Sequence, residues 1–347
     1  MVEKHTVKYN STIKEIMPKL EVLAKDAVLF VVNDDDSLIG SLTDGDVRRG
    51  FIRNLQMTNQ VSDIMNKNPQ FIYENEINLS MIKELREKNY KIIPLIDDKK
   101  RITNILNFRI QKSILPCDVV LMAGGKGSRL MPMTENTPKP LLKLGNKPII
   151  ETNIDRLIWY GVKNFHISIN YLGDQIVDYL GDGKEKGVSI KYIREKEPLG
   201  TIGSLGLIEK FNNDHILLMN SDLLTTIDFE EFMIDYLYNF CQMSIVGIPY
   251  QVKIPYGVLE TDENEVVGIK EKPSYTYYSN GGIYLINSAE VNKIPLNAYY
   301  DATDLIDKLI EKKCTVRYFQ LMDYWMDIGN HSDYKKAQND YSHLQLR

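Results

Sequence analysis

The first third of the chain carries one pattern of apolar and polar positions twice. Each copy has apolar residues at helical spacing, then a β-rich run, an acidic turn and a second β-rich run. The pattern predicts helices over 13–23 and 79–88 and strands over 28–32, 38–42, 91–96 and 101–106. A further helix is expected to begin at Thr43 or Asp44, either of which could cap it. The repeat predicts two similar supersecondary units in tandem.

Beyond residue 117 short apolar runs alternate with amphipathic segments. Strands are expected over 119–122, 164–170, 188–194, 215–220, 242–249 and 281–287, and a hairpin over 257–270. Helices are expected over 148–160, 173–180, 203–211, 228–240, 302–313 and 331–341. Strands that alternate with helices indicate βαβ units, and hence an α/β fold with a mostly parallel, Rossmann-like sheet covered on both faces.

The change of pattern coincides with the segment "SILPCD" at 113–118. Pro116 removes a backbone donor and restricts Leu115, which suits a connection between domains. We therefore predict an α/β pair of units over 1–114 and a second domain over 117–347.

Composition narrows the classes of partner. The formal net charge is −5, whereas a nucleic-acid binder is usually basic, so no nucleic-acid partner is expected. The three cysteines, Cys117, Cys241 and Cys314, have neither disulfide-framework nor zinc spacing, which favours a reducing compartment. The N-terminus is polar, and no apolar run approaches the roughly 18–20 residues that span a bilayer. A cytoplasmic protein without a membrane partner is the expectation.

The duplicated N-terminal pattern resembles a tandem pair of CBS domains, chiefly through "IGSLTDGDVRR" at 39–49. The resemblance implies that Thr43 and Asp46 bind the ribose and phosphate of an adenine nucleotide. The matching stretch "RITNILNFRI" at 101–110 lacks the Thr-x-x-Asp pattern, so at most one site is expected. A packing and dimerisation unit is the alternative, and either role suits a homo-oligomer.

The stretch "LMAGGKGSRLMPMTENTPKPLL" at 121–142 follows an apolar strand. The carboxyl edge of a parallel sheet is where ligands bind in open α/β folds. Gly124, Gly125 and Gly127 allow positive φ and close approach of a ligand, while Arg129 and Lys139 add positive charge. This combination predicts a nucleoside triphosphate site. A P-loop is absent, and Leu130 stands where a dinucleotide fingerprint needs glycine.

The longer pattern A-G-G-x-G-S-R-L-x-P-x-T, followed by P-K-P, resembles the signature of sugar-1-phosphate nucleotidyltransferases. Met122 stands where that family usually has Ala, and Ser128 where Thr is common. The resemblance implies the nucleotide-diphospho-sugar transferase type of sheet. It also implies that the nucleotide is bound by Ala123, Gly124, Gly125, Gly127 and Ser128, with Arg129 and Lys139 as catalytic cations.

Later segments match the same family in order and imply the remaining roles. "EKEPLGTIGSL" implies that Glu195 or Glu197, together with Gly200, faces the base. "MNSDLL" and "WMDIGNHSDY" imply that Asp222 and Asp327 hold Mg²⁺. "PYGVLE", "EKP" and "NGGIYLIN" imply sugar contacts from Tyr256, Gly257, Glu271, Asn280 and Gly281, with Lys272 on the sugar phosphate.

The implied reaction transfers a nucleotidyl group from a nucleoside triphosphate to a sugar 1-phosphate and releases pyrophosphate. The segment "EPLGT-x-G" resembles guanylyltransferases of the mannose-1-phosphate type more than thymidylyltransferases, whose counterpart usually carries Gln, and this resemblance implies GTP. The preference has a physical basis, since a glutamate can accept hydrogen bonds from N1–H and the exocyclic amine of guanine. A CBS pair in front of such a domain resembles bacterial guanylyltransferases that act on glucosamine 1-phosphate in legionaminic acid synthesis. Glucosamine 1-phosphate and mannose 1-phosphate are the expected acceptors, with the nucleotide sugar serving surface glycan synthesis.

Other interpretations remain open from the residues alone. Asp222 could end a strand as a turn residue, Lys272 could be solvated, and Glu271 and Asp327 could be caps or ion-pair partners. The chain could then be a catalytically inactive nucleotide sensor or scaffold. An RNA-linked nucleotidyl enzyme is a third alternative, disfavoured by the acidic balance.

Overall fold

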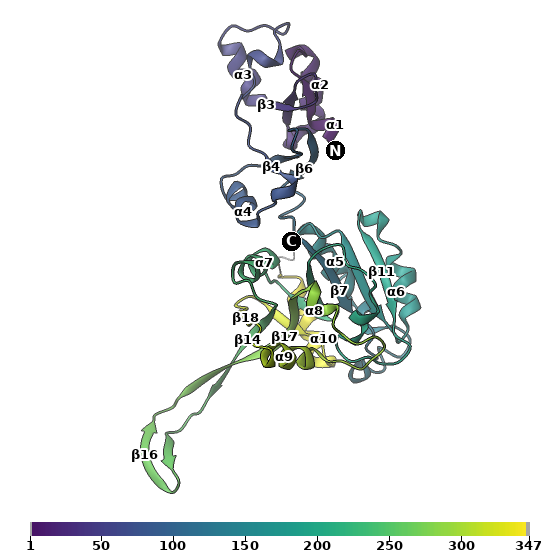
Figure 1. The fold of residues 1–347 in the computed structure, drawn as a ribbon, viewed down its shortest axis with the longest axis vertical. Helices are drawn as coiled ribbons and strands as arrows, with labels where there is room; N and C mark the ends of the chain where they lie inside the picture. The colour runs from purple at the N-terminus through teal and green to yellow at the C-terminus, as the bar shows by residue number, and fades with distance from the viewer. Residues whose placement is uncertain (1, 345–347) are drawn as a thin grey trace. The chain divides into compact units, whose positions relative to one another are not determined.

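The computed structural model describes residues 2–344, and the chain divides into two compact units, Met1–Ile114 and Leu115–Arg347 (Figure 1). Each unit has hydrophobic clusters of its own. Among the described residues, no helix combines the length and apolar character that crossing a bilayer requires.

The first unit contains two three-stranded sheets of the same design. The first is β1-β2-β3 and the second β4-β5-β6, and in each the first pair is parallel and the second antiparallel. The strands are Thr6–Lys8, Val28–Val32, Leu38–Thr43, Ile72–Tyr73, Ile92–Ile96 and Ile102–Asn107. The helices α1 to α4 are Val2–His5, Ile13–Leu23, Asp44–Ile52 and Leu79–Glu87. The predicted repeat is therefore confirmed; α1, β1 and β4 are too short for periodicity to reveal.

Local chemistry explains where these helices start. A capping box begins α2, because the side chain of Thr12 accepts from the Glu15 N–H and the Glu15 carboxylate accepts from the Thr12 N–H. Thr43 and Asp46 form the same box at the start of α3. Phe30 and Leu38 of the first half share a cluster with residues Ile92, Ile96 and Ile105 of the second, so the halves are packed together.

A seven-stranded sheet forms the centre of the second unit, in the order β11-β10-β7-β12-β17-β14-β18. Its strands, in that order, are Ser189–Arg194, Asn164–Ile169, Cys117–Met122, His215–Asn220, Ser274–Asn287, Met243–Lys253 and Val316–Gln320. The first four are parallel to one another, β17 is antiparallel to both of its neighbours, and β18 is parallel to β14. The mostly parallel α/β sheet is confirmed, and strand order reverses between β7 and β12.

Helices α5 to α10 are Ile149–Trp159, Gly173–Leu180, Phe229–Tyr238, Ser288–Val291, Ala302–Glu311 and His331–Tyr341. The expected helix over 203–211 is wrong, because only a 3-10 segment, Gly203–Leu207, forms there. A Cβ on Gly203 would lie 2.5 Å from the carbonyl oxygen of Ala298, and one on Gly206 2.9 Å from that of Pro295. Two glycines therefore let this turn pack directly against another backbone segment, which a regular helix would not allow.

Strands β14 and β17 continue beyond the sheet as a two-stranded ribbon (Figure 1). The ribbon carries the small hairpin of β15, Val258–Asp262, and β16, Glu265–Lys270. We call residues 249–278 the arm. Both strands are longer than the sequence pattern predicts, because the exposed arm has no buried face to impose an alternation of apolar and polar residues.

Candidate active site

A cleft of about 390 Å³ lies at the carboxyl ends of β7 and β12, where the strand order reverses. It is lined by many of the residues predicted to form the site: Ala123, Gly124, Gly125, Lys139, Glu195, Gly200 and Asp222. These residues come from four separate stretches of the chain. The sheet brings them together because neighbouring parallel strands end at the same edge.

The glycine-rich loop after β7 forms one wall of the cleft. The Ala123 N–H donates to the Ser168 carbonyl on β10 at 2.8 Å, which fixes the start of the loop. Of its three glycines only Gly127 has positive φ, at 62°, so that expectation is wrong for the other two. Gly124 lets the loop approach Glu195 closely, because a Cβ on Gly124 would lie 3.3 Å from Glu195 Oε1. Gly125 faces open space, which leaves its backbone accessible to a ligand.

Two distant aspartates become neighbours through a short pair of strands. Asp222 directly precedes β13, Leu223–Thr225, and Asp327 ends β19, Trp325–Asp327. The strands pair antiparallel with Leu223 opposite Asp327, so the two carboxylates lie side by side. The Lys139 ammonium forms an ion pair with Asp222 Oδ2 and lies 3.8 Å from Asp327 Oδ1. One predicted cation thus bridges both predicted metal ligands.

Burial and the adjacent Asp222 raise the pKa of Asp327, while the charges of Lys139 and Arg129 oppose this shift. Arg129 reaches this place from the glycine-rich loop, because a Cβ on Gly329 would lie 3.5 Å from its Nη1. Arg129 and Ser128 are exposed on a 3-10 turn, Ser128–Leu130, beside the cleft. Two cations and two carboxylates therefore meet at one end of the cleft.

The carboxylates suit a divalent cation. Asp222 Oδ1 and Asp327 Oδ1 are buried without a hydrogen-bond partner in the described part of the chain. Hard cations such as Mg²⁺ prefer oxygen ligands and commonly bind through one or two carboxylates together with substrate phosphates. Across residues 2–344 no group of three or more His, Cys, Asp or Glu side chains forms a metal site. This site would thus supply two ligands and leave the others to substrate and water.

The loop after β11 forms the opposite wall. Glu195 Oε1 accepts from Ser168 Oγ at 2.5 Å and Oε2 from the Leu199 N–H at 3.2 Å, so this carboxylate orders the loop. Gly200 has φ 79°, and a Cβ there would lie 2.8 Å from the carbonyl oxygen of Tyr300. Glu197 is exposed and does not line the cleft.

The predicted sugar contacts divide into two groups. Tyr256, Gly257, Glu271 and Lys272 lie on the exposed arm, and the structure does not bring them to the cleft. The reason is that β14 and β17 stay paired beyond the sheet and carry these residues outward. Asn280 and Gly281 lie closer, at the point where the arm leaves the sheet.

Contacts place Gly281, and Asn280 next to it in the chain, beside β19, the strand that ends at Asp327. The Trp325 indole N–H, from the strand that ends at Asp327, donates to the Gly281 carbonyl at 2.9 Å. Asn280 Oδ1 accepts from the Gly282 N–H at 3.0 Å, and a Cβ on Gly282 would lie 2.7 Å from Asn220 Nδ2 in the cleft wall.

Sequence reasoning missed four polar residues that line the cleft: Thr201, Asn220, Ser221 and Tyr299. Thr201, Asn220 and Ser221 lie within motifs that the sequence analysis singled out, so their position at a strand end or loop could have indicated them. Tyr299 had no such signal. It reaches the cleft because the segment before α9 packs on the loop after β11, where Asp301 Oδ1 accepts from the Thr201 N–H at 2.8 Å.

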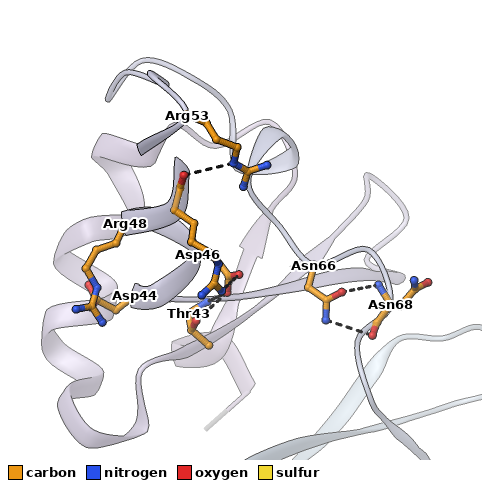
Figure 2. A network of polar contacts seen from close by, with 8 residues as sticks. Thr43, Asp44, Asp46, Arg48, Arg53, Asn66 and Asn68 are labelled. Atoms are coloured by element: carbon orange, nitrogen blue, oxygen red, sulfur yellow. Dashed lines mark hydrogen bonds and ion pairs between the residues drawn. The ribbon is translucent and has the colours of Figure 1, made fainter. Parts of the chain in front are cut away.

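The first unit contains a second cavity, of about 860 Å³, lined in part by Thr43, Asp46 and Asn66. Asp46 Oδ2 accepts from the N–H and hydroxyl of Thr43 at 2.8 and 2.7 Å, and Arg49 pairs with Oδ1 at 2.5 Å. Figure 2 shows Thr43 and Asp46 pointing toward each other at the start of α3. Burial alone would raise the pKa of Asp46, but these bonds outweigh it and hold the pKa below its ordinary value.

Comparison with known proteins agrees with this geometry. The model of the nucleotidyl transferase family matches residues 118–343, and the CBS domain model matches residues 2–53. A mannose-1-phosphate guanyltransferase of Yarrowia lipolytica is 31% identical over 62% of this chain and 61% of its own length. Mannose-1-phosphate guanyltransferase 2 of Candida glabrata is 32% identical over 62% of each chain. The match thus spans less than two thirds of these relatives.

Among solved structures, HddC from Yersinia pseudotuberculosis is similar to 65% of this chain and 99% of its own, with TM-score 0.50 and 27% identity. That protein has also been solved in complex with GMP-PN. A Bacillus anthracis protein assigned as a glucose-1-phosphate thymidylyltransferase gives TM-score 0.54 at 25% identity, over 66% of this chain and 96% of its own. Because the family model covers nearly the whole second unit and more than half of the sequence, the chain belongs to the nucleotidyl transferase family, with a CBS domain preceding the transferase region.

Proposed function

We propose that this protein transfers a nucleotidyl group, from GTP by preference, to a sugar 1-phosphate. The observation that carries the proposal is the convergence of Lys139, Asp222 and Asp327 with a glycine-rich loop in one cleft. An inactive sensor would need the loop to bind a nucleotide, but it would not need a buried lysine between two half-buried carboxylates.

In the reaction a phosphate oxygen of the sugar 1-phosphate attacks the α-phosphorus of the triphosphate. The bond from that phosphorus to the bridging oxygen of the leaving pyrophosphate breaks, and a nucleoside diphosphate sugar forms. The attacking oxygen is already ionised, so no strong general base is needed. The work of the protein is positioning and neutralisation of charge.

Each group has a role that its place supports. The glycine-rich loop gives backbone access to the triphosphate, and the guanidinium of Arg129 can grip phosphate oxygens with its planar fork. Lys139 neutralises charge that develops at the α-phosphate. Asp222 and Asp327 would hold Mg²⁺, which supplies further charge neutralisation at the phosphates when bound.

The preference for guanine rests on chemistry and on relatives. A glutamate at the base loop accepts from N1–H and the exocyclic amine of guanine. Both oxygens of Glu195 already accept bonds from the protein, whereas Glu197 is exposed on the same loop. Glu195 lines the cleft and its carboxylate orders the loop, so we keep both Glu195 and Glu197 as candidates for the base contact. The guanyltransferase relatives and the HddC complex support the preference for guanine.

For the acceptor we propose glucosamine 1-phosphate or mannose 1-phosphate, the latter being named for the relatives. The product would serve surface glycan synthesis. Asn280 and Gly281 are the sugar contacts that the geometry supports. Tyr256, Gly257, Glu271 and Lys272 enter the proposal through their motifs alone.

The first prediction is that pyrophosphate is released only when a nucleoside triphosphate and a sugar 1-phosphate are both present with Mg²⁺. The assay crosses GTP, ATP, CTP, UTP and dTTP with glucosamine, mannose and glucose 1-phosphates. GTP should give the highest kcat/KM. Turnover that is fastest with dTTP would contradict the base assignment, and no turnover with any pair would favour the inactive sensor.

We also propose that the cavity beside Thr43 and Asp46 binds an adenine nucleotide. Calorimetry on the full chain with AMP, ADP and ATP should show binding of at least one. Asp46→Asn should weaken that binding about tenfold, because one charge-assisted contact and the cap that orders it are lost. Asp35→Asn, the same change at an exposed turn, is the control. Heats equal to those of buffer would leave the unit as a packing and homo-oligomer element.

A further inference from the structure

The segment that carries Asp222 is held by two side chains of α5. Asn153 Nδ2 donates to the carbonyl oxygens of Ser221 and Leu223, at 3.3 and 2.9 Å, which are the residues on either side of Asp222. One turn later on the helix, Arg156 binds further carbonyls of the same segment. Its Nη1 donates to the Thr225 carbonyl, and its Nη2 to that of Ile227 at 2.7 Å. Four alternate carbonyls from 221 to 227 are therefore bound by residues three positions apart on one helix.

Both side chains are deeply buried, with 3% of Asn153 and 4% of Arg156 exposed. Removing a guanidinium from water is costly unless its environment compensates. Arg156 lies over the Phe229 ring at 5.3 Å and satisfies backbone carbonyls. Yet its Nε has no hydrogen-bond partner among residues 2–344. Tyr160 and Asp228 offset part of the cost of burying its charge. An apolar residue in this place would leave the carbonyls of Thr225 and Ile227 without their donors, so the arginine does more than fill space.

The same hydrogen bonds also affect the position of the second carboxylate, Asp327. Leu223, whose carbonyl Asn153 binds, pairs with Asp327 across β13 and β19. Thr225, whose carbonyl Arg156 binds, also donates its hydroxyl to the Tyr324 carbonyl at 2.9 Å, just before β19. Holding β13 therefore holds both members of the carboxylate pair. Neither Asn153 nor Arg156 itself lines the cleft, so any effect must pass through the backbone.

We propose that Asn153 and Arg156 are positioning residues that set the separation of Asp222 and Asp327 for a divalent cation. The inference takes its chemistry from the proposed function, which requires such a cation. Its test, however, depends on metal binding alone. It assigns to the buried face of α5 a role in the site that no sequence motif of the cleft indicates.

The test measures binding of Mn²⁺ alone to the full chain, by loss of the free-ion electron paramagnetic resonance signal. Asn153→Leu keeps a similar volume but removes both donated hydrogen bonds, and should weaken Mn²⁺ binding about tenfold, as residues behind metal ligands typically do. Thr152→Val is the matched control. It removes a buried hydroxyl on the same helix that bonds only to the Pro148 carbonyl, and Mn²⁺ binding should stay within twofold.

A double-mutant cycle separates positioning from general loss of stability. In the Asp222→Asn background, Asn153→Leu should cause no further loss of Mn²⁺ affinity, because the ligand that it positions is already altered. Arg156→Lys, which keeps the charge but loses the fork, gives an independent measurement if Asn153→Leu fails to fold. It should weaken Mn²⁺ binding severalfold. Unchanged Mn²⁺ affinity in the folded variants, with only a lower Tm, would overturn the proposal.

The outcomes distinguish this inference from the proposed function. Wild-type protein that turns over substrates, with variants that bind Mn²⁺ normally, would reject the positioning role and leave the function standing. If the wild-type protein turns over no substrate pair, while Asn153→Leu loses the Mn²⁺ binding of the wild type, the proposed function would be rejected and the positioning role would stand. Wild-type protein that binds no Mn²⁺ would overturn the positioning role outright.

Discussion

Replacing Lys139 by methionine is expected to lower kcat about 10²–10³-fold, the typical cost of one preorganised charge at a transition state. Lys139 is 8% exposed, so water cannot take over the role of its ammonium. Methionine has a similar length and packs in the same channel. The change therefore removes charge with little change of shape.

The same variant should bind Mn²⁺ at least as tightly as the wild type. The Lys139 ammonium and a divalent cation are drawn to the same two carboxylates, Asp222 and Asp327, so removing the ammonium removes a competitor. Lys143→Met is the control, since Lys143 is exposed nearby in the sequence. Activity in Lys139→Met within threefold of that of the control would contradict the assigned role.

Replacing Asp222 by asparagine should lower kcat about 10³-fold, an effect as large as that of Lys139→Met or larger. It should also weaken Mn²⁺ binding. Asp222 contributes one of two adjacent carboxylates, and its Oδ1 is buried without a hydrogen-bond partner among the described residues. Asparagine keeps the shape but has no negative charge with which to hold a cation. The two largest predictions therefore share a kinetic effect and differ in metal binding.

Asp214→Asn is the matched control for this change. Asp214 is exposed just before β12, at the opposite end of the strand from Asp222. It makes the same change in net charge, so the control should keep kcat and Mn²⁺ affinity within twofold. Should Asp222→Asn retain kcat within threefold of that of Asp214→Asn, the carboxylate pair would be structural and the metal assignment would fail.

Periodicity predicted most elements of this protein because it reports local packing. The apolar spacing of α2, the strand–turn–strand patterns and the limits of α10 follow from residues close together in the sequence. The prediction of a helix over 203–211 failed for a reason that is not local. Its glycines are needed by backbone at 295–298, which no neighbouring residue indicates.

The candidate site likewise has parts that nearby residues indicate and parts that depend on residues far apart in the sequence. The glycine-rich loop could be predicted because its glycines and cations lie within one short stretch that follows a strand. The partnership of Asp222 and Asp327 came from resemblance to a family, and the residues alone would not have paired them. Tyr299 could not be predicted, and the arm residues were expected at the cleft but lie outside it.

By itself the sequence determined the two-part organisation of the elements, the caps that start the helices and the glycine-rich, cationic character of one loop. These features depend on backbone preferences and side chains a few residues apart. Only the tertiary structure decided which distant charges meet. The register between β13 and β19 brings Asp327 to Asp222. Asn153 of α5 binds the carbonyls on either side of Asp222. Such pairings depend on how the whole sheet closes, and no local pattern of residues encodes that.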